Sequence, residues 1–572
     1  MARLVLICCL FWFCVACSHA DPGVGDAIPD PVDSPLPGAV AREPGSGEVY
    51  YIRPDGGSEI QCDGLADSPY LADGSNQSCA WDHPFRALSP GGSPQMAAGD
   101  TLVIAPGSYR IGYGAVGSDE YCDPDAAPEC RLAPIPGGIG PNQLTRILGK
   151  GWSSGCDEPP ELWGAGGADW ILDLTGASYV EVACLEITDH ATCAEDHTGG
   201  YACPPDPSLT DVWALSGIFA QDSSHVLLRD LNIHGLAGSG IHAGRLADWT
   251  LENVRLAGNG LAGWDGDMWD GEDSNNGTMQ FHNWLVEWNG CVETWPEDLP
   301  TGCWSQSAGG YGDGVGTGST GADWIIEDSA FLHNTSDGLD LLYHELGGKV
   351  RIERVRAEGN AGNQIKVTGL ETLVNSVMIG NCDYFDGQPF TYWVDPCRAL
   401  GNTLEVIYTG GEQTSLVNNA LYSRGDGLIF GSAREGFTCD GTERLIGYNN
   451  LFLGGGDSTS SGDSNFLFYQ EGCANLTFQA DFNLAYQVKN VEPPYVQPGF
   501  PGKHNALVAP GLVEPFVGEM FGMQPGMDSP LIDAGDDETC PKVDIALAPR
   551  PIDGDQDGVA SCDIGAYEWQ PH

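Results

Sequence analysis

Apolar and polar positions recur in a fixed order along the middle of the chain. An apolar residue is followed two positions later by Asn, Asp or Arg, and six positions after that by an asparagine. The final asparagines stand 30, 45, 26 and 21 residues apart, and this variation falls between short apolar segments, where loops tolerate insertions. The occurrences are Leu251…Asn253…Asn259, Phe281…Asn283…Asn289, Ile326…Asp328…Asn334, Ile352…Arg354…Asn360 and Val374-Asn375…Asn381, the last with its apolar residue one position closer.

This repeat predicts stacked coils. An asparagine at the same turn of successive coils can hydrogen-bond its neighbours above and below, and coils of about 21–26 residues with three short strands are typical of a solenoid. The 80 glycines and 38 prolines disfavour helices. We therefore expect an all-β chain, folded as a single-stranded right-handed parallel β-helix with disulfide-closed loops.

Four segments are expected from changes in composition. Residues 1–20 resemble a signal peptide, 21–48 form a Pro/Gly/Asp-rich linker, 49–515 form the β-helix, and 516–572 form a closing segment. Two readings of the leader remain open. Val15-Ala16-Cys17 resembles the end of a bacterial lipobox, which implies a lipidated Cys17 and an outer-membrane or cell-surface lipoprotein, whereas Ser18-His19-Ala20 would suit ordinary secretion.

Sixteen cysteines follow the leader, and an even number in an exported chain indicates disulfides. No Cys-x-x-Cys spacing occurs among them, which disfavours zinc or redox chemistry. Sequence cannot fix the connectivity, but pairing in chain order would close a local loop each time. The expected pairs are Cys62–Cys79, Cys122–Cys130, Cys156–Cys184, Cys193–Cys203, Cys291–Cys303, Cys382–Cys397, Cys439–Cys473 and Cys540–Cys562.

The net charge of −56, from 24 Lys and Arg against 80 Asp and Glu, excludes nucleic acid as a partner. It also repels anionic lipid, so a membrane is expected only through the possible lipid anchor. Acidic clusters can recruit Ca²⁺, which prefers carboxylate oxygens.

The register of the repeat brings carboxylates together. Equal positions of adjacent coils stack at about 4.8 Å. Two columns are predicted in this way, one of Asp313, Asp337 and Asn363 and the next of Gly316, Asp340 and Lys366. Because the apolar neighbours of Asp340 and Lys366 should face the core, these two side chains should face solvent. Three neighbouring carboxylates repel one another unless a cation joins them, and their hard oxygens favour Ca²⁺.

Four more cations surround Lys366 in the sequence, namely Lys349, Arg351, Arg354 and Arg356. In so acidic a chain they predict a local positive patch that would bind an acidic sugar.

Asn334-Thr-Ser-Asp337-Gly-Leu-Asp340-Leu and Gly362-Asn-Gln-Ile-Lys366-Val resemble the family nine polysaccharide lyases, which are calcium-dependent pectate lyases of the pectate-lyase-like β-helix superfamily. The resemblance implies that Asp313, Asp337 and Asp340 hold calcium and that Lys366 is the catalytic base. That family has two consecutive acids before the glycine. Here Ser336 takes the first of these ligand positions, so the ion has one negative ligand fewer.

We therefore expect an exported, monomeric lyase that cleaves a uronate-containing, pectate-like polysaccharide by calcium-assisted β-elimination. The base removes the proton next to the uronate carboxylate while the 4-linked sugar departs. Two alternatives remain open. One is a non-catalytic surface protein that binds glycans or a cell-surface partner, and the other is a glycoside hydrolase that uses paired carboxylates.

Overall fold

The computed structural model describes residues 47–570 except 72, 93, 193–211, 269–270, 297–298, 305–311, 345–346, 382, 386–389, 393–401, 425–426, 456–465, 474, 489–501 and 514–521. The leader with Cys17 and most of the expected linker lie outside the described residues. The pairs Cys193–Cys203 and Cys382–Cys397 lie outside them as well.

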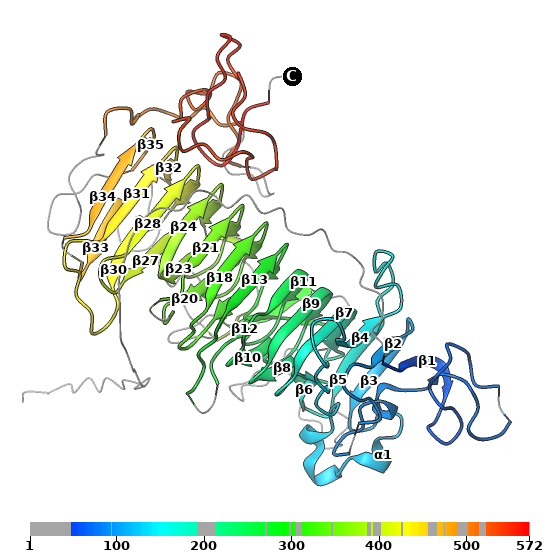
Figure 1. Ribbon diagram of the computed structural model, residues 1–572. Helices are drawn as coiled ribbons and strands as arrows, with labels where there is room; N and C mark the ends of the chain where they lie inside the picture. Colours follow the sequence, from blue (N-terminus) through cyan, green and yellow to red (C-terminus); the bar gives the residue numbers. More distant parts are fainter. Residues whose placement is uncertain are drawn as a thin grey trace, which may run out of the picture.

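The described chain winds as a stack of parallel coils, which confirms the predicted parallel β-helix (Figure 1). A typical coil gives two strands to a sheet of 22 strands and one strand to a sheet of 10. The strands of the smaller sheet are β6 (Ala168–Asp173), β8 (Ala214–Gln221), β10 (Ser239–Gly244), β12 (Ala262–Asp265), β17 (Val315–Gly316), β20 (Leu339–Leu341), β23 (Ile365–Thr368), β27 (Leu404–Tyr408), β30 (Gly427–Ala433) and β33 (Phe466–Glu471).

The larger sheet forms the other walls of the helix. Its strands are β1 (Val49–Gly57), β2 (Thr101–Ile104), β3 (Ser108–Gly112), β4 (Thr145–Gly149), β5 (Glu161–Ala165), β7 (Ser178–Asp189), β9 (Ser224–His234), β11 (Thr250–Ala257), β13 (Thr278–His282), β14 (Leu285–Glu287), β18 (Asp323–Glu327), β19 (Ala330–Leu332), β21 (Val350–Glu353), β22 (Arg356–Glu358), β24 (Leu370–Val374), β25 (Val377–Gly380), β28 (Gln413–Val417), β29 (Ala420–Ser423), β31 (Arg444–Tyr448), β32 (Leu451–Gly454), β34 (Thr477–Asp481) and β35 (Leu484–Tyr486).

The remaining elements are short. A three-stranded sheet consists of β15 (Cys291–Thr294), β16 (Leu299–Trp304) and β26 (Phe390–Tyr392). The helices are η1 (Pro84–Arg86), α1 (Ser118–Tyr121), η2 (Pro124–Glu129) and η3 (Asp383–Phe385). None of the helices in the described residues has the length and apolar character that crossing a membrane would need.

A left-handed residue marks the bend between the first two strand segments of many coils. The second position of the sequence repeat, occupied by Asn, Asp or Arg, is this residue. The φ values are 54° at Asn253, 50° at Asn283, 51° at Asp328, 52° at Arg354 and 49° at Asn375. Short polar side chains tolerate this conformation better than others do, which explains the prevalence of Asn and Asp at this position.

The asparagine ladder predicted at one turn of successive coils is present, and its members are buried inside the helix. Side-chain amides donate from Asn259 to Asn289 (2.9 Å), from Asn289 to Asn334 (2.9 Å) and from Asn334 to Asn360 (2.8 Å). The prediction was wrong for Asn381. The Asn360 amide instead donates to Gln364 (2.9 Å) and to the carbonyl oxygen of Phe331, so both of its hydrogens are used before the next coil begins.

A second ladder, which the repeat pattern did not reveal, continues at another turn. The amide of Asn419 donates to Asn450 (3.0 Å), that of Asn450 to Asn483 (2.9 Å) and that of Asn483 to Asn505 (3.0 Å). One buried asparagine ladder therefore joins the coils up to Asn360, and a second joins the coils from Asn419 onward.

Six of the eight expected disulfides are formed by the described residues, and each closes a local loop. They are Cys62–Cys79, Cys122–Cys130, Cys156–Cys184, Cys291–Cys303, Cys439–Cys473 and Cys540–Cys562. Such bonds are consistent with an exported protein.

The C-terminal segment, residues 522–570, packs along the side of the last coils (Figure 1). Leu531, Ile564 and Ala566 join a cluster with outward apolar residues of β25, β29 and β32. The same segment bonds the left-handed turn asparagines of three successive coils. The Asn375 amide donates to the carbonyl oxygen of Val543 (2.7 Å), the Asn418 amide donates to that of Asp563 (2.8 Å), and the Asn449 side-chain oxygen accepts from the N–H of Asp536 (2.7 Å).

Replacing Asn334 by alanine should lower the free energy of unfolding by about 2–3 kcal/mol, because the buried N–H and side-chain amide of Asn289 both lose the Asn334 oxygen to which they donate. The Asn360 side-chain oxygen loses one of two donors and keeps the backbone N–H of residue 334. The change is measured by urea denaturation followed by circular dichroism. Asn381→Ala is the matched control, and its cost should stay below about 1 kcal/mol because Asn381 lies outside the ladder. Equal losses for the two variants would contradict the structural role of the ladder.

Candidate functional site

One outward-facing column runs along the entire ten-stranded sheet. Its members are paired strand to strand, one residue from each strand. From the N-terminal end they are Asp173, Phe219, His242, Asp265, Gly316, Asp340, Lys366, Glu405, Phe430 and Tyr469. The flanking residues Leu339, Leu341, Ile365 and Val367 are fully buried, so Asp340 and Lys366 face outward as predicted.

Lys366 lies between two of the predicted aspartates. Its Nζ is 3.0 Å from Oδ2 of Asp340 and 3.4 Å from Oδ2 of Asp337. Burial of the side chain lowers the pKa of Lys366, but the attraction of Asp340, Asp337 and Glu405 outweighs burial and raises it. Lys366 is therefore a protonated ammonium group in this arrangement.

The surrounding carboxyl groups hold protons more tightly than ordinary acids do. Burial, followed by repulsion from Asp337 and Asp340, raises the pKa of Asp313 to about 7. Burial also raises the pKa of Asp340 to about 6 and that of Glu405 to about 7, in both cases against the opposing attraction of Lys366. One ammonium group does not neutralise four carboxyl groups, so the cluster binds protons or another cation.

Backbone and polar side-chain groups fix the carboxylates in place. Oδ1 of Asp313 accepts the N–H of Asp337 (2.9 Å), and Oδ1 of Asp337 accepts the N–H of Asn363 (2.6 Å). Asp313 also accepts the hydroxyl of Ser336, which is fully buried. Asp313, Ser336, Asp337, Asp340 and Lys366, predicted from separate coils, thus form one cluster.

Gly316 leaves a gap in the column between Asp265 and Asp340. A Cβ atom at this position would lie 2.9 Å from Oδ2 of Asp313, which is closer than such contacts allow. The carboxylate of Asp313 therefore uses the space that a side chain at residue 316 would fill.

Glu405 is a member of the cluster that sequence reasoning missed. It pairs with Lys366 in the next coil, and its Oε1 accepts the hydroxyl of Ser432 (3.0 Å). Asn363 links it to Asp337 through an amide that donates to both side chains. The pattern Leu404-Glu405-Val406 repeats that of Ile365-Lys366-Val367, but the insertion between these strands hides the register in the sequence.

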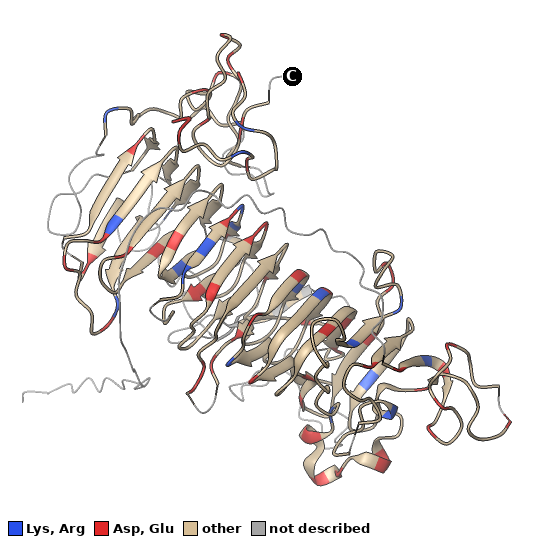
Figure 2. Cartoon of the chain, viewed as in Figure 1, with Lys and Arg blue, Asp and Glu red and all other residues tan. Residues whose placement is uncertain are grey.

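The four other predicted cations do not surround Lys366, because β21 and β22 belong to the larger sheet. Each is paired with an acid there, so the positive patch expected from their sequence positions is not formed. The pairs are Lys349–Glu371, Arg351–Glu371, Arg354–Asp328 and Arg356–Glu358. Figure 2 shows acidic residues along the length of the described chain and Lys and Arg at far fewer positions.

The oxygen ligands of the cluster suit a hard divalent cation, but the ammonium group of Lys366 lies between two of the carboxylates. Asp313, Asp337 and Asp340 supply carboxylate oxygens, and Ser336 supplies a hydroxyl. The oxygens of Asp313, Asp337 and Asp340 are not all within 4.8 Å of one another. Among the described residues, three carboxylates come that close at Asp533, Asp553 and Asp555 in the C-terminal segment. In the cluster, the ammonium of Lys366 occupies the space between Asp337 and Asp340, so a metal ion there would have to displace it.

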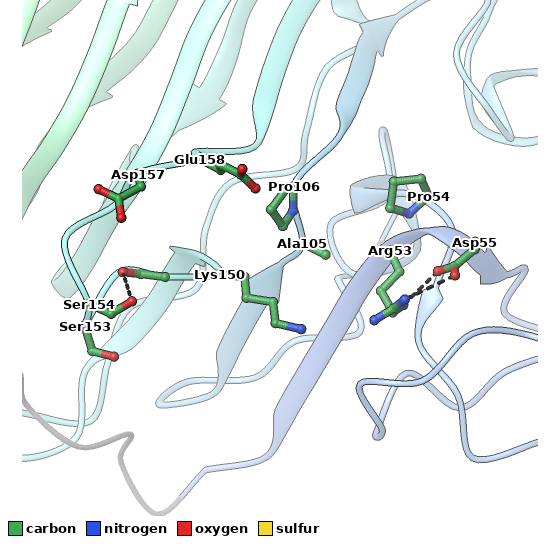
Figure 3. Close-up of a pocket in the computed structure, with 11 residues that line it drawn as sticks. Arg53, Pro54, Asp55, Ala105, Pro106, Lys150, Ser153, Ser154, Asp157 and Glu158 are labelled. Carbon is green, nitrogen blue, oxygen red and sulfur yellow. Dashed lines mark hydrogen bonds and ion pairs between the residues drawn. The ribbon is translucent and has the colours of Figure 1, made fainter.

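A separate open hollow lies beside β1 and β4 and contains none of these residues (Figure 3). Its two cations already have partners in the protein, because Arg53 and Lys150 bind opposite oxygens of Asp67 at 3.0 and 2.6 Å. Its lining consists of Arg53, Pro54, Asp55, Ala105, Pro106, Lys150, Gly151, Ser153, Ser154, Asp157 and Glu158.

Solved structures with a similar fold include several polysaccharide lyases. The pectate lyase Pel9A is 13% identical with a TM-score of 0.40, covering 93% of this chain and 98% of its own. An alginate lyase from Paenibacillus sp. str. FPU-7 is 14% identical with a TM-score of 0.32, covering 69% and 93%, and a rhamnogalacturonan lyase is 11% identical with a TM-score of 0.33, covering 82% and 91%. At this level the similarity concerns the fold alone. No family model matches the chain, and no curated protein matches its sequence.

In the presence of EDTA, the melting temperature should fall as the pH rises from about 4 to about 7. A carboxyl group whose pKa is raised on folding stabilises the folded state fully below its unfolded pKa, and this stabilisation is lost as the pH rises through about 6 for Asp340 and about 7 for Asp313. Asp313→Asn removes one such group, so its melting temperature should fall less steeply over the same range. Parallel curves for the two proteins would contradict the raised pKa of Asp313.

Proposed function

We propose that this protein is a polysaccharide lyase that cleaves a uronate-containing polysaccharide by β-elimination, with Lys366 as the base. Calcium would be held by Asp313, Asp337 and Asp340, with the Ser336 hydroxyl nearby. The observation that carries the proposal is the position of Lys366, an outward lysine whose ammonium lies 3.0 Å from Asp340 and 3.4 Å from Asp337. A structural ion pair needs one acid, whereas this lysine faces a group of acids too numerous for it to neutralise.

The reaction requires Lys366 to be neutral. A neutral amine takes the C5 proton of the uronate, the bond between C4 and the glycosidic oxygen breaks, and a C4–C5 double bond forms. While Asp337 and Asp340 face Lys366, its raised pKa keeps it protonated and unable to act as a base. When bound, calcium would withdraw charge from the substrate carboxylate and would compete with Lys366 for the same aspartates. The base and the acids are therefore one functional unit.

The side chains that would meet the substrate are those that remain accessible in the outward column. The side chains of Lys366 and Asp340 are 17% and 16% exposed, so both reach solvent at the wall of the helix. Asp313 and Asp337, at 2% and 1% exposure, are buried and would not contact the substrate directly. We further propose that the chain is exported, with which its six described disulfides agree, and that a lipid on Cys17 tethers it to the cell surface.

A glycoside hydrolase is a second candidate function, and a raised pKa favours it. Glu405, half-buried in the outward column with a pKa of about 7, would be partly protonated near neutral pH, which a general acid for glycosidic-bond cleavage needs. The products distinguish the two functions, because only β-elimination forms a double bond that absorbs in the ultraviolet.

Lys366→Ala should abolish the calcium-dependent rise in ultraviolet absorbance on uronate-containing polysaccharides, lowering kcat by at least about 100-fold because no other base replaces it. EDTA should abolish the rise in the wild-type protein. Lys349→Ala is the matched control, because Lys349 immediately precedes β21 of the larger sheet, is paired with Glu371 and should be dispensable. New reducing ends without ultraviolet absorbance would establish the hydrolase instead, and neither signal on any substrate would leave a binding protein.

Calcium should raise the melting temperature of the wild-type protein, and Asp337→Asn should remove most of this rise. Calorimetric titration with calcium in the absence of substrate gives the same information independently of activity. Asp555→Asn serves as the control, because it alters the separate acidic group of the C-terminal segment and leaves the Lys366 cluster intact. If Asp555→Asn alone removed the stabilisation, the ion would be bound in the C-terminal segment and the proposed calcium site would be wrong.

A further inference from the structure

The accessible part of the outward column begins at Asp265. Phe219 and His242, at 4% and 6% exposure, are covered, and Phe219 packs with Trp170 and Met268 in a small apolar cluster. From Asp265 through Lys366 to Tyr469 the side chains are half-buried, apart from the gap at Gly316. A polysaccharide that lies along the axis of the helix on this sheet would therefore meet this stretch.

The charges along the stretch do not suit a polymer with a carboxylate on every sugar. Lys366 is its one lysine or arginine, and carboxyl groups of Asp340 and Glu405 stand immediately on either side. Asp265 adds a further acid before Gly316. Calcium on Asp340 would leave one uronate matched at Lys366, but the neighbouring uronates of a homopolymer would lie against the carboxyl groups of Glu405 and Asp265, which is unfavourable in a partly buried site.

Cations elsewhere on the molecule do not offset the repulsion between these acids and the carboxylates of such a polymer. Arg351 on β21 of the larger sheet and Lys349 just before that strand share Glu371. Arg434 follows β30, four positions beyond Phe430, where it donates to the carbonyl oxygen of His344 (3.0 Å) with its guanidinium 5.7 Å from the centroid of the Tyr343 ring. Within the described residues, the column thus offers charge complementarity to a single uronate.

The positions after Glu405 are aromatic. The rings of Phe430 and Tyr469 stack with their centroids 4.5 Å apart and their planes inclined by 18°. The Tyr469 hydroxyl donates to Oδ1 of Asn402 (2.5 Å), and this bond fixes the orientation of the Tyr469 ring. Both side chains are half-buried, and an amphipathic ring surface of this kind suits the apolar face of an uncharged sugar better than a carboxylate.

We propose that the substrate is an acidic heteropolysaccharide in which a uronate is flanked by neutral sugars. The uronate lies at Lys366, and a neutral sugar packs against Phe430 and Tyr469. This inference rests on the proposed lyase function and narrows its substrate class, because it excludes polymers built of uronates alone as preferred substrates.

The test compares polymers that present a uronate with and without neutral neighbours. Polygalacturonate and alginate are the homopolymers. The rhamnogalacturonan backbone, in which the same galacturonate alternates with rhamnose, and gellan, with one glucuronate in each repeat, are the heteropolymers. Initial rates of ultraviolet absorbance with calcium should give a kcat/KM at least about tenfold higher on one of the heteropolymers than on either homopolymer. An equal or higher value on a homopolymer would overturn this inference and leave the lyase proposal standing, whereas no product from any of the four would overturn both.

Two variants test the aromatic positions directly. Tyr469→Ala should raise KM on the preferred heteropolymer about tenfold while kcat changes less than twofold, because the ring contacts a sugar away from the reacting bond. Tyr486→Ala, an exposed tyrosine of the larger sheet, is the matched control and should leave both constants unchanged. Phe430→Arg should shift the preference toward polygalacturonate by supplying a second cation. An unchanged KM in Tyr469→Ala together with an unchanged preference in Phe430→Arg would overturn the placement of the neutral sugar.

Discussion

The backbone hydrogen bonds between parallel coils are the constraint on which the rest of the molecule depends. They hold equal positions of neighbouring coils at about 4.8 Å, so residues far apart in sequence become neighbours with a fixed spacing. Asp340, Lys366 and Glu405 come from three different coils and face outward in one row for this reason alone. Each coil thus contributes one side chain to this outward row.

The same constraint creates the electrostatic problem at the site. Fixed spacing brings Asp313, Asp337, Asp340 and Glu405 around one lysine, and burial removes the water that would otherwise separate their charges. The cluster responds by holding protons on some carboxyl groups and by keeping Lys366 charged. A cation bound by these acids would change the electrostatic environment of every member, so the protonation of Lys366 depends on what else the acids hold.

Much of the fold and the centre of the site could be predicted because both follow from register. The repeat placed Asn259, Asn289, Asn334 and Asn360 in one ladder and aligned Asp340 with Lys366. The prediction for the fifth asparagine, Asn381, was wrong because the side chain of Gln364 accepts the Asn360 amide within the same coil. The spacing of the asparagines gives no sign of this bond. Glu405 was missed because a long insertion interrupts the count, and Lys349, Arg351, Arg354 and Arg356 were misplaced because nearness in sequence was taken for nearness in space, whereas each coil turns between sheets.

The C-terminal segment has a consequence for how such a chain can evolve. A solenoid in which each coil contacts only its neighbours can gain or lose a coil by duplication or deletion in its gene. Here one segment bonds the turn asparagines Asn375, Asn418 and Asn449 of three successive coils at once. A coil inserted among these three would pull the bonds out of step, whereas a coil inserted before them would not. The chain can therefore gain coils on the N-terminal side of this segment, whereas the three coils that the segment bonds are fixed in number.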